Sequence, residues 1–173
     1  YPAFDWGENP RFPSPTFRVL GMPDPGTFAE YICVPAGHVF PKPDFLSWEQ
    51  AAAIPLAGLT AWRALMTQAA ARPGETVLVT GIGGGVATFA LKWAVALGAR
   101  TFVTSGNPAK LEQAQQLGAV GGVDYRAEGW VKRLGGTQMR ALFGLDDGSA
   151  LVADYHQLCR LTYEEGQLTK QAL

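Results

Sequence analysis

Cysteine, net charge and long apolar runs are all scarce in this chain of 173 residues. The two cysteines, Cys33 and Cys159, are too few for a disulfide scaffold and are typical of a reducing compartment. A formal net charge of −1 provides no basic surface for nucleic acid. No apolar run is long enough to span a bilayer, and the first residues show no secretory signal. We therefore expect a cytoplasmic protein with no nucleic-acid or membrane partner.

Glycine, by contrast, is abundant, and one cluster of it follows an apolar run. Thr76–Thr80 predicts a buried parallel strand, and Val86–Leu97 predicts a helix that stops at Gly98. Between them lies Gly81-Ile-Gly-Gly-Gly85. A strand, a glycine turn and a helix in this order suit a nucleotide pyrophosphate, since glycine lets the backbone approach and the helix presents free N–H groups. A plain connection between strand and helix is the alternative interpretation of the cluster alone.

The pattern then repeats along the chain. Arg100–Ser105 predicts a second strand, Ala109–Leu117 a helix that Gly118 ends, and Gly121–Tyr125 a third short strand. Strands and helices alternating at this spacing predict an α/β fold, a Rossmann-type doubly wound parallel sheet that is partial in this chain.

The segments before this unit are less regular. Residues 1–26 are rich in proline and aromatics and predict a long ordered loop. Thr27–Pro35 predicts a strand, and His38–Pro43 predicts a second extended piece. Ser47 and Gln50 form a capping-box pattern that opens a helix, and Leu56–Ala70 predicts a further helix after Pro55.

After about Gly135 the periodicity weakens. Met139–Phe143 and Ala150–Leu161 are compatible with helices, but neither finds a place in the sheet.

The end of the second strand indicates which dinucleotide is bound. NAD-binding members of this fold carry an acid there for the ribose 2′-hydroxyl, whereas Thr104–Asn107 contains none. A hydroxyl at Ser105 and an ammonium at Lys110 can instead bind a 2′-phosphate, which a carboxylate would repel. The pattern favours NADP(H). The alternative is that Lys110 is an ordinary solvated residue and Ser105 a small residue before a turn.

Several segments together resemble one family, the medium-chain dehydrogenase/reductase superfamily. The likeness is greatest to its zinc-type alcohol dehydrogenase-like and quinone oxidoreductase-like members. The matching segments occur in the family's order over residues 1–133: Gly26–Tyr31, Leu46–Trp62, Pro73–Val79, Gly81–Ala87, Lys110–Glu112 and Asp124–Arg126.

This resemblance implies an oxidoreductase with a GroES-like catalytic domain and a Rossmann-type cofactor domain. It implies that Thr60 contacts the cofactor near its nicotinamide and that Gly84, Gly85 and Val86 form the pyrophosphate loop. Ser105, Lys110 and Tyr125 match positions that NADP-using members place around the 2′-phosphate. Ala87 stands where many members have the last glycine of the motif.

Compared with the family, the chain is expected to be incomplete. We interpret residues 1–45 as the C-terminal part of the GroES-like domain, 46–133 as a partial NADP-binding domain and 134–173 as an unassigned tail. The tail does not resemble the family's fourth strand. Truncation, a joining of separated pieces and a frameshift all account for this pattern.

Zinc is not expected, although the resemblance suggests it. Zinc-dependent members carry a cysteine four residues before the threonine matched by Thr60, and this chain has Leu56 there. Cys33 is interpreted as a small buried hydrophobe, His38 as a surface or hydrogen-bonded loop residue, and His156 with Cys159 as a weak pair.

Two hypotheses for the function follow. The first is an NADP(H)-dependent, zinc-independent oxidoreductase that moves a hydride to or from a small-molecule substrate, namely a carbonyl, enone or quinone. The second is a truncated, non-catalytic nucleotide-binding or interaction module. No catalytic residue is identified. Whether this chain is active alone, and whether it forms a homodimer, stays open.

Overall fold

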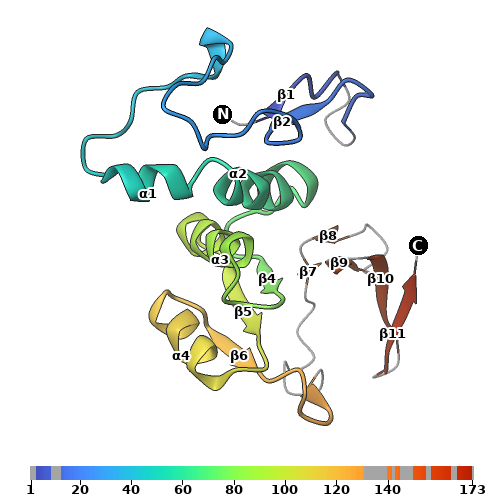
Figure 1. The fold of residues 1–173 in the computed structure, drawn as a ribbon. Coiled ribbons are helices and arrows are strands. Elements are labelled where there is room, and N and C mark those ends of the chain that lie inside the picture. The colour runs from blue at the N-terminus through green and yellow to red at the C-terminus, as the bar shows by residue number, and fades with distance from the viewer. Residues whose placement is uncertain are drawn as a thin grey trace. The chain divides into compact units, whose positions relative to one another are not determined.

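A computed structural model describes residues 3–8, residues 13–130 and several later strand segments, for which only the backbone is considered. The chain divides into two compact units, Tyr1–Leu59 and Thr60–Leu173. Figure 1 shows the order of their elements, and each unit is described by itself. No helix in these described parts is both long and apolar enough to cross a membrane.

The first unit contains little regular structure. β1 (Ala3–Phe4) pairs antiparallel with β2 (Arg18–Leu20), which pairs parallel with β3 (Pro23–Asp24). Two ring contacts accompany these strands: Trp6 lies edge-on to Phe17 at 5.1 Å, and Phe4 lies 4.8 Å from the ring of His38. The predicted loop over 1–26 therefore contains three short strands.

The strand predicted over Thr27–Pro35 is wrong. That segment is irregular and is followed by a 3₁₀ turn, η1 (Ala36–His38), so the second extended piece does not begin at His38. A strand forms only where a neighbour completes its hydrogen-bond ladder, and no described strand pairs with these residues. Apolar side chains here are exposed as a result, including Phe28 and Tyr31.

The helical predictions that follow are confirmed. α1 (Trp48–Ala53) begins with a complete capping box, in which Ser47 and Gln50 each bind the other's backbone N–H. α2 (Ala57–Trp62) continues directly into a π-helical segment, η2 (Arg63–Gln68). Within the second unit η2 packs on α3, and Trp62 lies edge-on to Trp93 at 5.6 Å.

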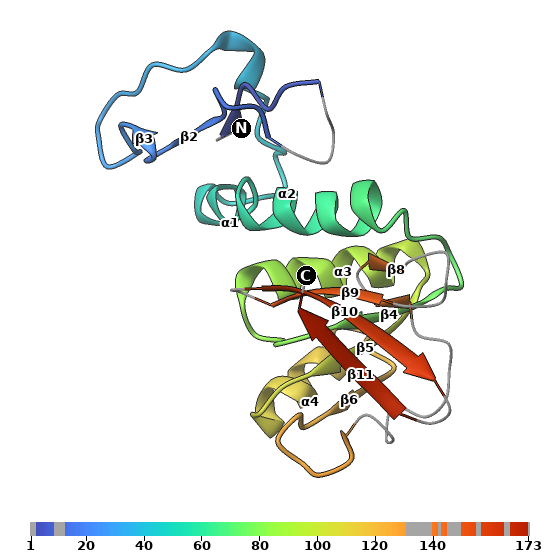
Figure 2. The same cartoon turned by 90° about the vertical axis from the view of Figure 1, so that its right-hand side faces the viewer.

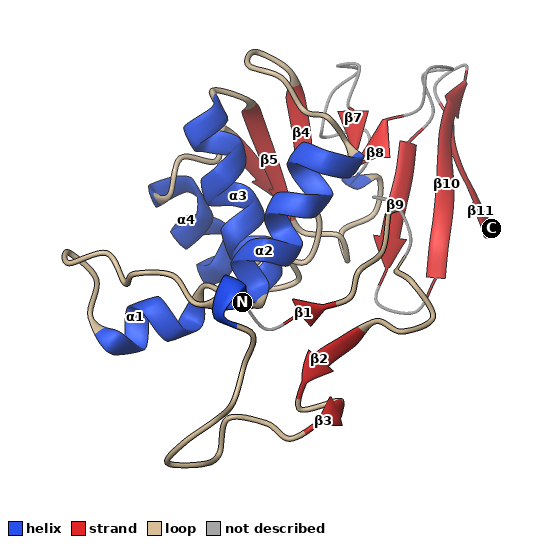
Figure 3. Ribbon diagram, turned by 90° about the horizontal axis from the view of Figure 1, so that it is seen from above, coloured by secondary structure: helices blue, strands red, loops and turns tan. Residues whose placement is uncertain are grey.

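A parallel sheet organises the second unit. Its strands are β4 (Thr76–Val79), β5 (Arg100–Thr104), β6 (Gly121–Val123) and β7 (Arg140–Ala141), in the order β6-β5-β4-β7. α3 (Gly85–Leu97) connects β4 to β5, and α4 (Pro108–Gln116) connects β5 to β6. Both helices lie on one face of the sheet (Figure 3). The predicted Rossmann-type fold is confirmed.

Buried apolar side chains hold this sheet to its helices. Leu91 and Ala94 of α3 pack with Val77 and Val79 of β4 and with Val103 of β5, and all five are at most 3% exposed. The Val-Leu-Val run of β4 is buried throughout, as predicted from its lack of alternating polar residues. This core fixes the ends of β4 and β5, where the glycine cluster and Ser105 lie.

The tail differs from its prediction. Met139–Phe143 and Ala150–Leu161 were compatible with helices from the sequence, but both regions contain strands. β8 (Phe143–Gly144), β9 (Ala150–Asp154), β10 (Gln157–Glu164) and β11 (Gln167–Ala172) form an antiparallel sheet (Figure 2). β7 pairs parallel with β4 as a fourth strand, which was also not expected. Short apolar runs fit either structure, and pairing across two-residue connections selects the strand.

Candidate nucleotide-binding site

The glycine turn after β4 has a backbone that only glycine adopts readily. Gly81 has φ +66° and Gly83 has φ +113°, and α3 begins two residues later. A β-carbon on Gly81 or Gly84 would meet no atom within 4 Å, so the described chain leaves open space beside the turn.

The N-terminus of α3 presents backbone donors to that space. Gly84 is the N-cap, and no side chain caps the helix. Its carbonyl accepts from the N–H and the hydroxyl of Thr88, at 2.9 and 2.8 Å. In an α-helix the N–H groups of the first turn lack intrahelical acceptors. Gly85 and Val86 supply two of these, which is the arrangement that binds a phosphate.

The turn is tied to the end of the neighbouring strand. The Ile82 N–H donates to the Thr104 carbonyl at 2.9 Å, and the Gly81 N–H donates to Thr104 Oγ1 at 3.2 Å. Ile82 itself is only 5% exposed. These contacts set the glycine turn directly beside the end of β5, where a dinucleotide's ribose is recognised in this fold.

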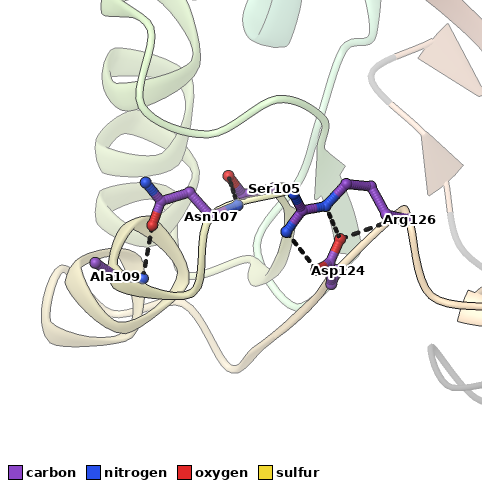
Figure 4. A network of polar contacts seen from close by, with 5 residues as sticks. All are labelled: Ser105, Asn107, Ala109, Asp124 and Arg126. Atoms are coloured by element: carbon purple, nitrogen blue, oxygen red, sulfur yellow. Dashed lines mark hydrogen bonds and ion pairs between the residues drawn. The ribbon is translucent and has the colours of Figure 1, made fainter.

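Ser105 follows β5 and is 5% exposed, so its hydroxyl is less accessible than the prediction of a phosphate ligand suggests. Its Oγ accepts from the Asn107 N–H at 3.2 Å, and the Asn107 side chain caps α4 by accepting from the Ala109 N–H (Figure 4). The Ser105 hydroxyl hydrogen can still be donated. Ser105 therefore stabilises the turn between β5 and α4, and its hydroxyl can also donate one hydrogen bond to a ligand.

Lys110 lies closer to the glycine turn than was expected. A β-carbon on Gly83 would come within 2.5 Å of its Cδ and 2.9 Å of its Nζ. The ammonium is thus beside the predicted pyrophosphate loop. From the sequence, this lysine was assigned to the 2′-phosphate.

Tyr125 and Arg126 lie beside Gly106, immediately after β5. A β-carbon on Gly106 would be 3.0 Å from Tyr125 Oη and 3.0 Å from Arg126 Nε. Tyr125, one of the predicted site residues, is therefore brought to the expected strand end. Arg126 was in the matched Asp124–Arg126 segment but was not predicted as a site residue. Its only signal in the sequence is an arginine two residues after an aspartate at the end of a strand.

Arg126 is held by Asp124 in a two-point ion pair (Figure 4). Its Nε donates to Oδ1 at 3.1 Å and its Nη2 donates to Oδ2 at 2.9 Å. The Arg126 guanidinium lowers the pKa of the Asp124 carboxyl, and the carboxylate raises the pKa of Arg126. Asp124 is consequently a poor acceptor for a ribose hydroxyl, since its oxygens already serve Arg126.

Thr60 lies on α2 and is exposed, while the adjacent Ala61 is fully buried. Its helix is joined to α3 through the contact of Trp62 with Trp93. Contact between Thr60 and the nicotinamide end of a cofactor remains a prediction.

The described residues do not provide a zinc site. They contain no group of three or more His, Cys, Asp or Glu side chains that could hold a metal. Cys33 is exposed and lies outside any strand, so its interpretation as a buried hydrophobe is wrong. His38 is half-buried against Phe4. His156 lies outside the described residues, and for Cys159 only the backbone is described.

The sequence of this chain is similar to those of known proteins. The family described as "Zinc-binding dehydrogenase" matches residues 85–148. The "Zinc-type alcohol dehydrogenase-like protein YogA" of Leptosphaeria maculans is 41% identical over 143 residues, which are 78% of this chain and 40% of that protein. The chain therefore spans about two fifths of that relative's length.

Two solved structures are also similar. An NAD-dependent alcohol dehydrogenase has 43% sequence identity and a TM-score of 0.67, over 70% of this chain and 36% of that one. The quinone oxidoreductase of Thermus thermophilus, also solved in complex with NADPH, has 40% identity and a TM-score of 0.56, over 64% of this chain and 36% of that one.

Proposed function

We propose that this chain, which belongs to the medium-chain dehydrogenase/reductase superfamily, is the nucleotide-binding part of an NADP(H)-dependent oxidoreductase. The observation that carries the proposal is the glycine turn between β4 and α3. Its positive-φ glycines, its open space and the uncapped N-terminus of α3 form a cradle for a pyrophosphate.

The residues of this chain would bind and orient the cofactor. Backbone N–H groups of Gly85 and Val86 would donate to the pyrophosphate, with Lys110 adding positive charge beside Gly83. Ser105 and Tyr125 would contact the adenosine ribose at the end of β5. When bound, the nicotinamide supplies or accepts a hydride at C4.

The choice of NADP(H) over NAD(H) rests on charge. No acid lies in Thr104–Asn107, and Asp124 is already paired with Arg126. A 2′-phosphate at the end of β5 therefore meets the Arg126 guanidinium and no unpaired carboxylate from these strand ends. One similar structure is described as NAD-dependent and the other is a complex with NADPH, so the comparisons favour neither nucleotide.

For the reaction we propose hydride transfer to a carbonyl, enone or quinone. The described residues do not form a zinc site, and Leu56 occupies the position at which the resemblance places a cysteine ligand. Reduction of an activated double bond or quinone needs no Lewis acid to polarise an alcohol, and it fits this residue set better than alcohol oxidation.

A non-catalytic nucleotide-binding or interaction module is the second candidate. It is favoured by the apolar surface of the first unit, where large side chains such as Phe28, Phe45 and Trp48 are exposed.

A fluorescence titration with NADPH and with NADH tests the cofactor proposal. We expect NADPH to bind at least tenfold more tightly than NADH, because only NADPH carries the 2′-phosphate. Equal affinities would contradict the NADP(H) assignment, and binding of neither would contradict the nucleotide site. Turnover of a quinone or an enone with NADPH then separates the enzyme from the binding module.

A further inference from the structure

Gly106 is a glycine for reasons of space. Its φ is not in the left-handed region, so the backbone alone does not require glycine here. A β-carbon at this position would lie 3.0 Å from both Tyr125 Oη and Arg126 Nε and 3.2 Å from Arg126 Cδ. The absent side chain is therefore what allows the guanidinium to lie against the end of β5.

Arg126 keeps donors for a ligand while it is held in place. A guanidinium has five N–H donors, and the pair with Asp124 uses one on Nε and one on Nη2. The Arg126 side chain is 61% exposed, so solvent and solutes reach it. A planar cation with three remaining donors is suited to a phosphate, which accepts several hydrogen bonds from one guanidinium.

The two cationic side chains of the site, Lys110 and Arg126, lie beside different glycines. The Lys110 ammonium is beside Gly83 of the pyrophosphate turn, whereas the Arg126 guanidinium is beside Gly106 at the strand end. NADH and NADPH share the pyrophosphate, and only NADPH carries a phosphate on the adenosine ribose, which this fold recognises at the end of its second strand.

We propose that Arg126, held by Asp124 against Gly106, binds the 2′-phosphate and sets the preference for NADP(H), while Lys110 acts on the pyrophosphate that both nucleotides carry. This inference rests on the proposed function. It reverses the expectation that Lys110 is the cation that discriminates between the nucleotides.

The test compares Arg126→Ala, Lys110→Ala and Lys92→Ala by titration with NADPH and NADH. Lys92 is the matched control because it is an exposed lysine on α3. We expect Arg126→Ala to weaken NADPH at least tenfold and NADH less than twofold. Lys110→Ala should weaken both nucleotides by similar factors, and Lys92→Ala neither.

Two further measurements separate recognition from folding. Gly106→Val should reproduce the NADPH-selective loss, because its side chain displaces Tyr125 and Arg126. Adenosine 2′,5′-bisphosphate should compete with NADPH more strongly than 5′-AMP in the wild type, and this advantage should disappear in Arg126→Ala. Thermal midpoints identify any variant that is merely unfolded.

The outcomes distinguish this inference from the proposed function. A wild type that binds neither nucleotide, or does not prefer NADPH, contradicts the proposed function. A wild type that prefers NADPH, combined with an Arg126→Ala variant that keeps the same preference, overturns only the role of Arg126. Selective loss of NADPH in Lys110→Ala would return the discriminating role to the lysine.

Discussion

The two units of the chain differ in how far their large apolar side chains are buried. In Thr60–Trp130, helices and strands share a continuous core in which Leu65, Leu91 and Val103 are fully buried. In the described part of Tyr1–Leu59, Phe4 is the only large apolar side chain that is buried. Phe28, at 109% relative exposure, is one of the large apolar side chains that are exposed in that unit. The second unit is therefore stabilised by an apolar core of its own. The described part of the first unit buries few apolar side chains.

The largest expected effect is on the core of the second unit. Leu91→Ala should lower the free energy of unfolding by about 2–5 kcal/mol, because it removes a fully buried side chain and leaves a cavity. Phe28→Ser in the first unit should change it by less than about 0.5 kcal/mol, because the ring is exposed. Urea unfolding of both variants measures the contrast. Equal losses would show that the first unit buries Phe28 in solution.

A smaller effect is expected at the glycine turn. Gly83→Ala should cost about 1–3 kcal/mol of stability, because alanine is strained at φ +113°. It should also weaken NADPH and NADH alike, because the new methyl group displaces Lys110. Gly37→Ala is the control in the first unit, since a β-carbon there meets nothing within 4 Å. An unchanged affinity in Gly83→Ala would remove the turn from the nucleotide site.

The smallest effect concerns pH. The Arg126 guanidinium lowers the pKa of Asp124, so the pair stabilises the native state above the unfolded pKa of about 3.9 and this contribution is lost as pH falls through the lowered native value. Wild type should therefore be slightly more stable than Asp124→Asn at pH 7. The difference should vanish in strong acid. Urea midpoints at several pH values measure it, and a difference that grows toward low pH would contradict the assignment.

The same contrast explains which elements were predictable. From Thr76 to Val123 every strand and helix was predicted to within one or two residues, because buried apolar runs and glycine stops act locally. The prediction of a strand over Thr27–Pro35 failed because a strand depends on a partner elsewhere in the chain. The strands after residue 139 were not predicted for the same reason. Their short apolar runs fit a helix or a strand, and pairing with neighbouring strands decides between the two.

The candidate site shows the same limit. Gly84, Gly85 and Val86 follow from a contiguous motif, and the structure places them at the start of α3 as expected. Arg126 required knowledge that the loop after β6 meets Gly106 after β5, which spacing in the sequence does not reveal. The position of Lys110 beside Gly83 is likewise a matter of tertiary structure.

The hydrogen bonds from Gly81 and Ile82 to Thr104 also have a kinetic and entropic consequence. They join residues as far as 23 apart in the sequence and hold the turn in shape through the sheet itself. A nucleotide that binds at such a turn orders little additional backbone. The backbone entropy of the turn is therefore lost when the chain folds and not when the nucleotide binds. The amide hydrogens of Gly81 and Ile82 should accordingly exchange slowly with solvent before any ligand is added.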